Sequence, residues 1–152
     1  MVSSIAIERF ETGGTGLLSY THNSRVTKEI KIRTGRADQP PKSEWRRGIS
    51  GIPIGHFWLW NIKKYIQQYN DLDATGSEIG RFYPISSDPN NHRIISNPLG
   101  NHERWDIGLH DENGKPFSLG CPVIVDNLDF RKLVNALSNT PEGLVRLDVK
   151  WK

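Results

Sequence analysis

Short runs in which apolar and polar residues alternate, separated by glycine and proline, constrain this sequence most. The clearest run closes the chain, where Val145, Leu147, Val149 and Trp151 alternate with more polar side chains. A two-residue period places successive side chains on opposite faces of a β-strand. The 14 glycines and 9 prolines are spread between such runs and mark their ends. The chain is therefore predicted to be mainly β.

The same reading assigns the individual elements. We expect strands at residues 4–10, 17–21, 27–34, 56–60, 104–110, 122–125 and 144–151. A helix is predicted over 129–137, because Phe130, Leu133, Val134 and Leu137 recur at helical spacing. Residues 63–69 suit either a short helix or one arm of a hairpin. On the strand at 104–110, Trp105, Ile107 and Leu109 would share one face, and we assign the aromatic residues Trp58, Trp60, Tyr83 and Trp105 to the core.

A chain of 152 residues is long enough for one domain with a proper core. We see no internal repeat and no domain boundary, so residues 1–152 are treated as a single domain. Residues 71–101 are rich in Asp, Asn, Ser, Gly and Pro, and we expect a long loop or insertion there. A loop of that length in a compact domain is usually functional or inserted.

Composition excludes several classes of protein. Hydrophobic residues make up 36% and charged residues 24%, and no apolar run is long enough to span a membrane. The net charge of +3 is scattered, which argues against nucleic acid as a partner. The five histidines show no metal-ligand spacing, so we expect no metal and no cofactor. No signal peptide is visible at the N-terminus, and we expect synthesis in the cytoplasm.

The sequence contains a single cysteine, Cys121. One cysteine cannot form an intramolecular disulfide, so it is a buried inert thiol, one half of an intermolecular bridge, or a nucleophile. His110 ends a predicted strand and could supply the base that a cysteine nucleophile needs. Gly120 would give the backbone freedom to direct amide groups at an oxyanion, and Ser118 could orient the imidazole. Judged on these residues alone, an inert cysteine is the commoner case.

The order of several short motifs resembles a known family. His110 is followed by Ser118-x-Gly120-Cys121, and upstream stand Arg33-Thr34-Gly35 and Pro53-Ile54-Gly55-His56-Phe57. Together with the predicted helix and the closing strand, this order resembles the catalytic domain of L,D-transpeptidases, the YkuD-like fold. The resemblance covers nearly the whole chain. It implies a mainly β fold, a β-sandwich of mixed sheets with one or two short helices.

Two positions differ from the family pattern. Typical members carry His between the Ser and the Gly and an Arg two residues after the Cys, where this chain has Leu119 and Val123. A divergent branch of interbacterial effectors that attack peptidoglycan accepts another residue at the first position. The segment Ser50–Phe57 is similar to one found in that branch. Arg81 and Arg104 are our candidates to replace the missing Arg, and Leu119 would border the substrate.

The resemblance implies a cysteine acyl-transfer enzyme that acts on peptidoglycan stem peptides. Cys121 would be the nucleophile, His110 the base, and the amides of Gly120 and Cys121 the oxyanion hole. Water, an amine or a D-amino acid could accept the acyl group, giving carboxypeptidase, cross-linking or exchange activity. A secreted antibacterial effector would act in the periplasm or cell wall, with an immunity protein or a secretion-system component as partner. No insertion into a membrane is expected.

Two other interpretations stay open. The chain could be a catalytically inactive module on the same scaffold that binds the cell wall or belongs to a phage structure. A papain-like amidase ranks lower, because such enzymes place the Cys before the His, at the start of a helix.

Overall fold

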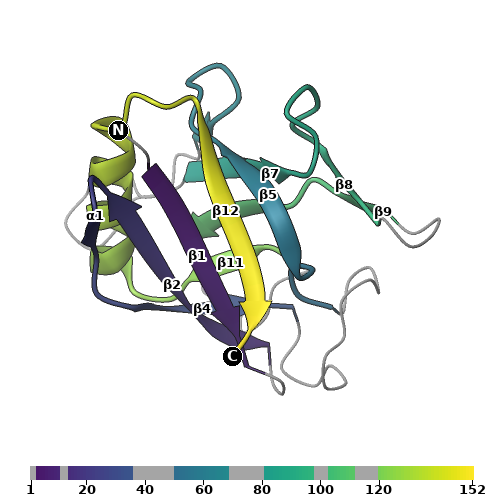
Figure 1. The fold of residues 1–152 in the computed structure, drawn as a ribbon, viewed down its shortest axis with the longest axis horizontal. Helices are drawn as coiled ribbons and strands as arrows, with labels where there is room; N and C mark the ends of the chain where they lie inside the picture. The colour runs from purple at the N-terminus through teal and green to yellow at the C-terminus, as the bar shows by residue number, and fades with distance from the viewer. Residues whose placement is uncertain (1–2, 11–13, 36–49, 69–80, 98–102, 112–119) are drawn as a thin grey trace.

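The computed structural model of the chain describes residues 3–10, 14–35, 50–68, 81–97, 103–111 and 120–152 (Figure 1). Within these ranges the fold is mainly β, with mixed strand pairing and one short helix, as the sequence predicts. The main sheet contains the strands β1 (Ser3–Arg9), β2 (Thr15–His22), β4 (Ile30–Thr34), β5 (Gly55–Trp60), β7 (Arg81–Ser86), β10 (Gly108–Asp111), β11 (Pro122–Ile124) and β12 (Leu144–Trp151).

These eight strands form a closed ring in the order β1-β12-β5-β7-β10-β11-β4-β2, and β2 pairs back onto β1. Two pairs are parallel, β1 with β12 and β10 with β11, and the other neighbours in the ring are antiparallel. The short strands β3 (Arg25–Val26) and β6 (Gln67–Gln68) pair antiparallel with β2 and β7, respectively. Strands β8 (Ile94–Ser96) and β9 (Glu103–Trp105) form a separate hairpin-like pair.

The core fills the inside of this ring. Alternate residues of each long strand point inward, and this explains why the runs of the sequence with a period of two form the strands of one closed sheet. The fully buried side chains of the strands include Ile5, Ile7, Leu18, Ile32, Leu59, Tyr83, Ile85, Leu109, Ile124, Val145 and Leu147. Burial of such side chains contributes about 1.5–3 kcal/mol each, so the ring is the main source of stability.

Helix α1 (Asn127–Ser138) packs beside the ring (Figure 1). Asp126 caps it, because its carboxylate accepts hydrogen bonds from the backbone amides of Leu128 and Asp129 at 2.8 and 3.0 Å. The cap starts the helix two residues before the predicted position. Phe130, Leu133 and Leu137 are buried, as their spacing predicts. The described residues include no helix long and apolar enough to cross a membrane.

The stretch 71–101, expected as one long loop, contains two strands. Residues 81–86 form β7, which lies between β5 and β10 in the ring, and residues 94–96 form β8. The sequence pattern did not predict β7, because Pro84 interrupts the strand and its buried run is short. Pro84 is the register partner of Gly108 on β10, and β7 pairs with β5 through Ile85 and Ser86.

The predicted strand at 104–110 is broken at Asp106, whose φ of 55° is left-handed. The break reverses which side chains face inward. Arg104 is buried at 2% exposure, whereas Trp105, which we had assigned to the core, is 42% exposed. Trp60 and Tyr83 are buried as expected, and Trp58 is only half-buried.

Candidate active site

The parallel pairing of β10 and β11 brings the predicted nucleophile and base to one face of the sheet. His110 is the register partner of Val123, and Cys121 lies two residues before Val123. Cys121 directly precedes β11, and if the alternation of that strand continues back to it, Cys121 lies on the face of Val123 and His110. The residues that connect the two strands, 112–119, lie outside the described residues.

A row of register partners crosses the sheet at His110. Phe82, His110, Val123, Arg33 and Thr15 stand opposite one another on five adjacent strands, β7, β10, β11, β4 and β2. We call these five residues the His110 row. Directly opposed residues lie on the same face with their Cβ atoms about 4.5–5.5 Å apart. The row therefore sets an aromatic ring beside the imidazole and a guanidinium two strands away.

The imidazole of His110 is held from two sides. Its Nδ1 lies 2.7 Å from the carbonyl oxygen of Asp111, and because a carbonyl only accepts, Nδ1 must donate. In the neutral imidazole, Nε2 then carries the lone pair, which is the arrangement that a general base needs. The ring of Phe82 stacks on the imidazole, with centroids 5.8 Å apart and planes 23° apart. Phe82 also covers Gly108, where any added Cβ would collide with its ring.

Cys121 is partly exposed and packs against the edge of the core. Its Sγ lies 3.9 Å from the carbonyl oxygen of Asp106. Burial raises the pKa of the thiol, and the negative charge of Asp106 adds to this; the backbone amide of Gly108 and the positive charge of Arg104 act in the opposite direction. At neutral pH the resting group is therefore a thiol. Such a cysteine becomes a nucleophile only when a neighbouring base takes its proton.

Gly120 precedes the cysteine in a conformation suited to glycine, with a φ of +127°. A Cβ at this position would collide with the guanidinium of Arg104. The carbonyl of Gly120 accepts a hydrogen bond from the Thr34 hydroxyl at 3.0 Å, and that hydroxyl accepts from the amide of Ile52 at 2.7 Å. Thr34 thus fixes the turn before Cys121 to the segment at residues 50–52.

Two buried arginines hold that segment in place. Arg104 donates to the carbonyl oxygens of Ser50 and Gly51, both at 3.0 Å. Arg9 donates to the carbonyl of Ile52 at 2.7 Å, and its guanidinium lies over the ring of Trp151. Both arginines are only 2% exposed. The guanidinium of Arg104 is thus engaged with backbone beneath the turn, and its contact with a substrate carboxylate stays a prediction.

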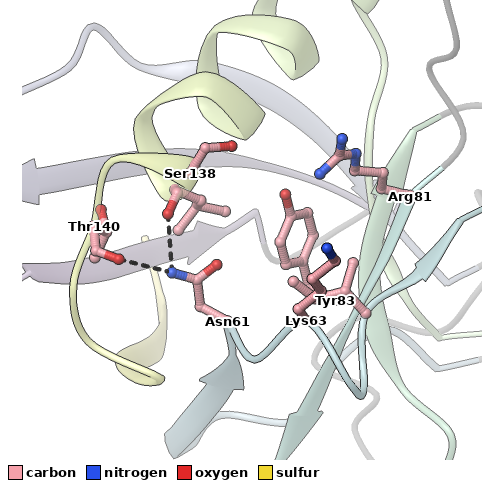
Figure 2. Close-up of a pocket in the computed structure, with 8 residues that line it drawn as sticks. Asn61, Lys63, Arg81, Tyr83, Ser138 and Thr140 are labelled. Carbon is pink, nitrogen blue, oxygen red and sulfur yellow. Dashed lines mark hydrogen bonds between the residues drawn. The ribbon is translucent and has the colours of Figure 1, made fainter.

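Of the other residues that the sequence singles out, Arg81 is described and lies elsewhere. Ser118 and Leu119 lie outside the described residues, so their roles stay predictions. Arg81 follows the opposite parity to Phe82 on β7 and therefore lies on the other face of the strand. There it lines a cavity of about 580 Å³ together with Tyr83 and Lys63 (Figure 2).

Sequence reasoning missed two members of the His110 row, Phe82 and Arg33. Phe82 falls in the stretch expected as a loop, so nothing local pointed to it. Arg33 stands in the Arg33-Thr34-Gly35 motif, but its place opposite Val123 depends on the pairing of β4 with β11. The described residues contain no group of three or more His, Cys, Asp or Glu that could hold a metal ion.

Comparisons with known proteins identify no family. No protein-family model matches the chain, and no curated protein matches it. A solved structure, that of the helical cell shape determining protein Pgp2 from Campylobacter jejuni, is similar with a TM-score of 0.48 and 13% sequence identity. The similarity covers 99% of this chain and 49% of that protein, so the chain spans about half of its length. Similarity at this level assigns neither a family nor an activity.

Proposed function

We propose that the protein is a cysteine acyl-transfer enzyme that acts on peptidoglycan stem peptides. The observation that supports this best is the position of His110 on the strand next to Cys121, together with the hydrogen bond between its Nδ1 and a backbone carbonyl. Val123, two residues after Cys121, is the register partner of His110 on the adjacent strand, and the backbone carbonyl of Asp111 accepts the Nδ1 proton, so that Nε2 carries the lone pair of the neutral ring. The ordered motifs of the sequence supply the substrate class, through their resemblance to L,D-transpeptidases.

The geometry of a parallel pair is suitable for proton transfer. Strands lie about 4.8 Å apart and two residues advance about 6.6 Å, which puts the Cα atoms of diagonal neighbours about 8 Å apart. The side chains of a cysteine and a histidine together cover that distance when both lean toward each other. The Phe82 ring, stacked on the imidazole, limits the rotation of His110 away from the cysteine.

In the first half of the reaction, the Sγ proton of Cys121 passes to Nε2 of His110. The sulfur attacks the carbonyl carbon that links an L-centre to a D-centre in the stem peptide. Backbone amides of Gly120 and Cys121 stabilise the oxyanion of the tetrahedral intermediate. The C–N bond then breaks, the imidazolium returns its proton to the leaving amine, and a thioester remains on Cys121.

In the second half, His110 removes a proton from the acceptor, which attacks the thioester carbonyl. The C–S bond breaks, and the sulfur takes the proton back from the imidazolium. Water as acceptor gives a shortened peptide, and an amine gives a cross-link or an exchanged D-amino acid. If the protein is an effector, a secretion machine, lysis or a partner would deliver it, and an immunity protein would protect the producing cell.

Arg33 is our candidate for the substrate carboxylate. The family pattern places a cation two residues after the cysteine, where Val123 stands, and Arg33 is the register partner of Val123 on the same face. Like His110, Arg33 is therefore a diagonal neighbour of Cys121, from the strand on the opposite side. Arg33 is half-buried, and Arg104 holds backbone carbonyls instead. A guanidinium at this position would bind a carboxylate through two parallel N–H···O hydrogen bonds.

A direct test is incubation of the purified protein with diaminopimelate-type muropeptides, followed by mass spectrometry of the products. The wild type should shorten, exchange or cross-link the peptides, and the Cys121→Ala and His110→Ala variants should leave them unchanged. Unchanged muropeptides with the wild type, across donors and acceptors, would contradict the proposal.

A raised pKa is also what an unreactive thiol would show, and this leaves a second candidate, a non-catalytic module that binds the cell wall. That candidate predicts that the protein sediments with peptidoglycan and that Cys121→Ala binds as well as the wild type. It further predicts no change in the peptides. Turnover that disappears in Cys121→Ala would exclude it.

A further inference from the structure

A cavity of about 580 Å³ lies away from the cysteine, between the turn after β5, the start of β7 and the end of α1 (Figure 2). Asn61, Lys63 and Ile66 come from the end of β5 and the turn after it. Arg81 and Tyr83 come from the start of β7, and the other wall is the C-terminal end of α1 with the residues that follow, Leu137, Ser138 and Thr140. A volume of this size holds a small organic ligand rather than a lone ion.

The cavity is separate from the cysteine site. Arg81 and Tyr83 alternate along β7 with Phe82, whose ring stacks on His110. Alternate residues of a strand point to opposite faces, so the cavity and the His110 row lie on opposite sides of β7. A ligand in the cavity would therefore not occupy the space around Cys121.

The cavity has a positive end. Arg81 is half-buried, and Lys63 reaches toward Tyr83 from the turn after β5 (Figure 2). Within the described ranges, neither cation has a carboxylate partner. Burial raises the pKa of Tyr83, although the charge of Arg81 and its hydrogen bond lower it in part, so the phenol stays a donor at neutral pH. A half-buried guanidinium beside a phenol and an ammonium group favours a bound anion.

The opposite wall is rigid and offers an acceptor. The Nδ2 of Asn61 donates to the carbonyl oxygens of Leu137, Thr140 and Glu142 at 3.0, 3.4 and 3.2 Å. These bonds fix the amide and turn its oxygen toward the cavity (Figure 2). Ile66 and Leu137 add apolar surface between the acceptor and the cations. The lining thus combines cationic donors, one amide acceptor and an apolar wall.

We infer that this cavity binds the C-terminal residue of a short peptide. Its carboxylate would receive hydrogen bonds from Arg81, Lys63 and the Tyr83 hydroxyl. Its backbone N–H would donate to the Asn61 oxygen, and its aliphatic side chain would pack on Ile66 and Leu137. Inorganic phosphate could use the cationic end but has no group for the other walls. The site does not depend on chemistry at Cys121.

Isothermal titration calorimetry with acetyl-L-Ala-D-Ala tests this inference. We expect saturable binding of the free acid and at least tenfold weaker binding of the same peptide with a C-terminal amide. Arg81→Gln and Lys63→Gln should each weaken binding of the acid at least fivefold. Cys121→Ala should bind as the wild type does, which separates this site from the proposed enzyme site.

Lys64→Gln is the matched control for Lys63→Gln, because Lys64 is the next residue, is also exposed and is not among the residues that line the cavity. Lys63 is exposed, so its variant will fold even where Arg81→Gln does not. Equal binding of the acid and the amide, or equal loss in Lys63→Gln and Lys64→Gln, would overturn the inference. Phosphate that binds more tightly than the peptide acid would overturn the assignment of the ligand.

Discussion

Arg33 on β4 stands directly opposite Val123 on β11, on the same face as His110. Each strand beside β11 therefore carries a register partner of Val123, two residues after Cys121: a histidine on one side and an arginine on the other. The chain has Val123 two residues after its cysteine where the family pattern has an arginine. Strand pairing places the guanidinium-bearing residue Arg33 next to Val123. We base the first prediction on this relationship.

Arg33→Ala should raise KM for muropeptide substrates about ten- to a hundredfold, the effect of one charge-assisted hydrogen bond. The change in kcat should be smaller, because the cation contacts a group away from the reacting carbonyl. Lys31→Ala is the control, since Lys31 lies two residues earlier on β4, shares the face of Arg33 and is exposed. The double variant Arg33→Ala/Val123→Arg should recover much of the loss. Equal effects of Arg33→Ala and Lys31→Ala would contradict the assignment.

Phe82→Ala should lower kcat on the order of tenfold or more, because the imidazole of His110 loses the ring that stacks on it. Phe82→Tyr keeps the ring and should retain most activity. Two-dimensional NMR of the His110 ring protons supplies a second readout, since removal of the Phe82 ring current will shift them. Unchanged kcat and unchanged shifts in Phe82→Ala would show that the ring does not position the base.

Gly120→Ala should destabilise the fold by about 2 kcal/mol or more, since its φ of +127° is unfavourable for alanine and the new Cβ meets the buried Arg104 guanidinium. Gly143→Ala is the matched control. Its Cβ would lie 3.1 Å from Cγ1 and 3.5 Å from Cδ1 of Ile62, a half-buried side chain that can shift, and the φ of Gly143 is not positive. Urea unfolding followed by tryptophan fluorescence measures both, and equal destabilisation would refute the strain at Gly120.

The thiol should make stability depend on alkaline pH. Burial raises the pKa of Cys121 in the folded state above the unfolded value of about 8.5. The folded state thus holds this proton more tightly than the unfolded state does. The contribution of the protonated thiol to the free energy of unfolding is therefore fully present below about pH 8.5 and is lost as the pH rises through the folded pKa. The free energy of unfolding of the wild type should fall more between pH 8 and pH 10 than that of Cys121→Ser. Parallel pH profiles of the two proteins would contradict the raised pKa.

Long periodic runs allowed the sequence to predict their elements. The strand at residues 144–151 is observed with those bounds, and the buried face of α1 is the one that Phe130, Leu133 and Leu137 define. Strand β7 was missed, since Pro84 and a short buried run hide its period. Trp105 was wrongly assigned to the core because Asp106, with its left-handed backbone, reverses the alternation of buried and exposed residues. No neighbouring residue in the sequence predicts that turn.

The candidate site divides in the same way. Cys121, His110 and Gly120 could be selected from one local motif, since the chemistry of each residue type is visible in sequence. Arg33 and Phe82 could not, because their places beside the motif arise from strand pairing between segments far apart in the chain. Register depends on the closed ring as a whole, which no local window contains.

Intact-protein mass spectrometry tests the central claim most directly. The protein is mixed with a stem tetrapeptide, quenched with acid within seconds and mapped by proteolysis. We predict an adduct on Cys121 whose mass is that of the tetrapeptide without its terminal D-amino acid, present in the wild type and absent in His110→Ala and Cys121→Ala. No adduct in the wild type, or an adduct of equal yield in Cys121→Ala, would contradict the assignment of Cys121 as nucleophile.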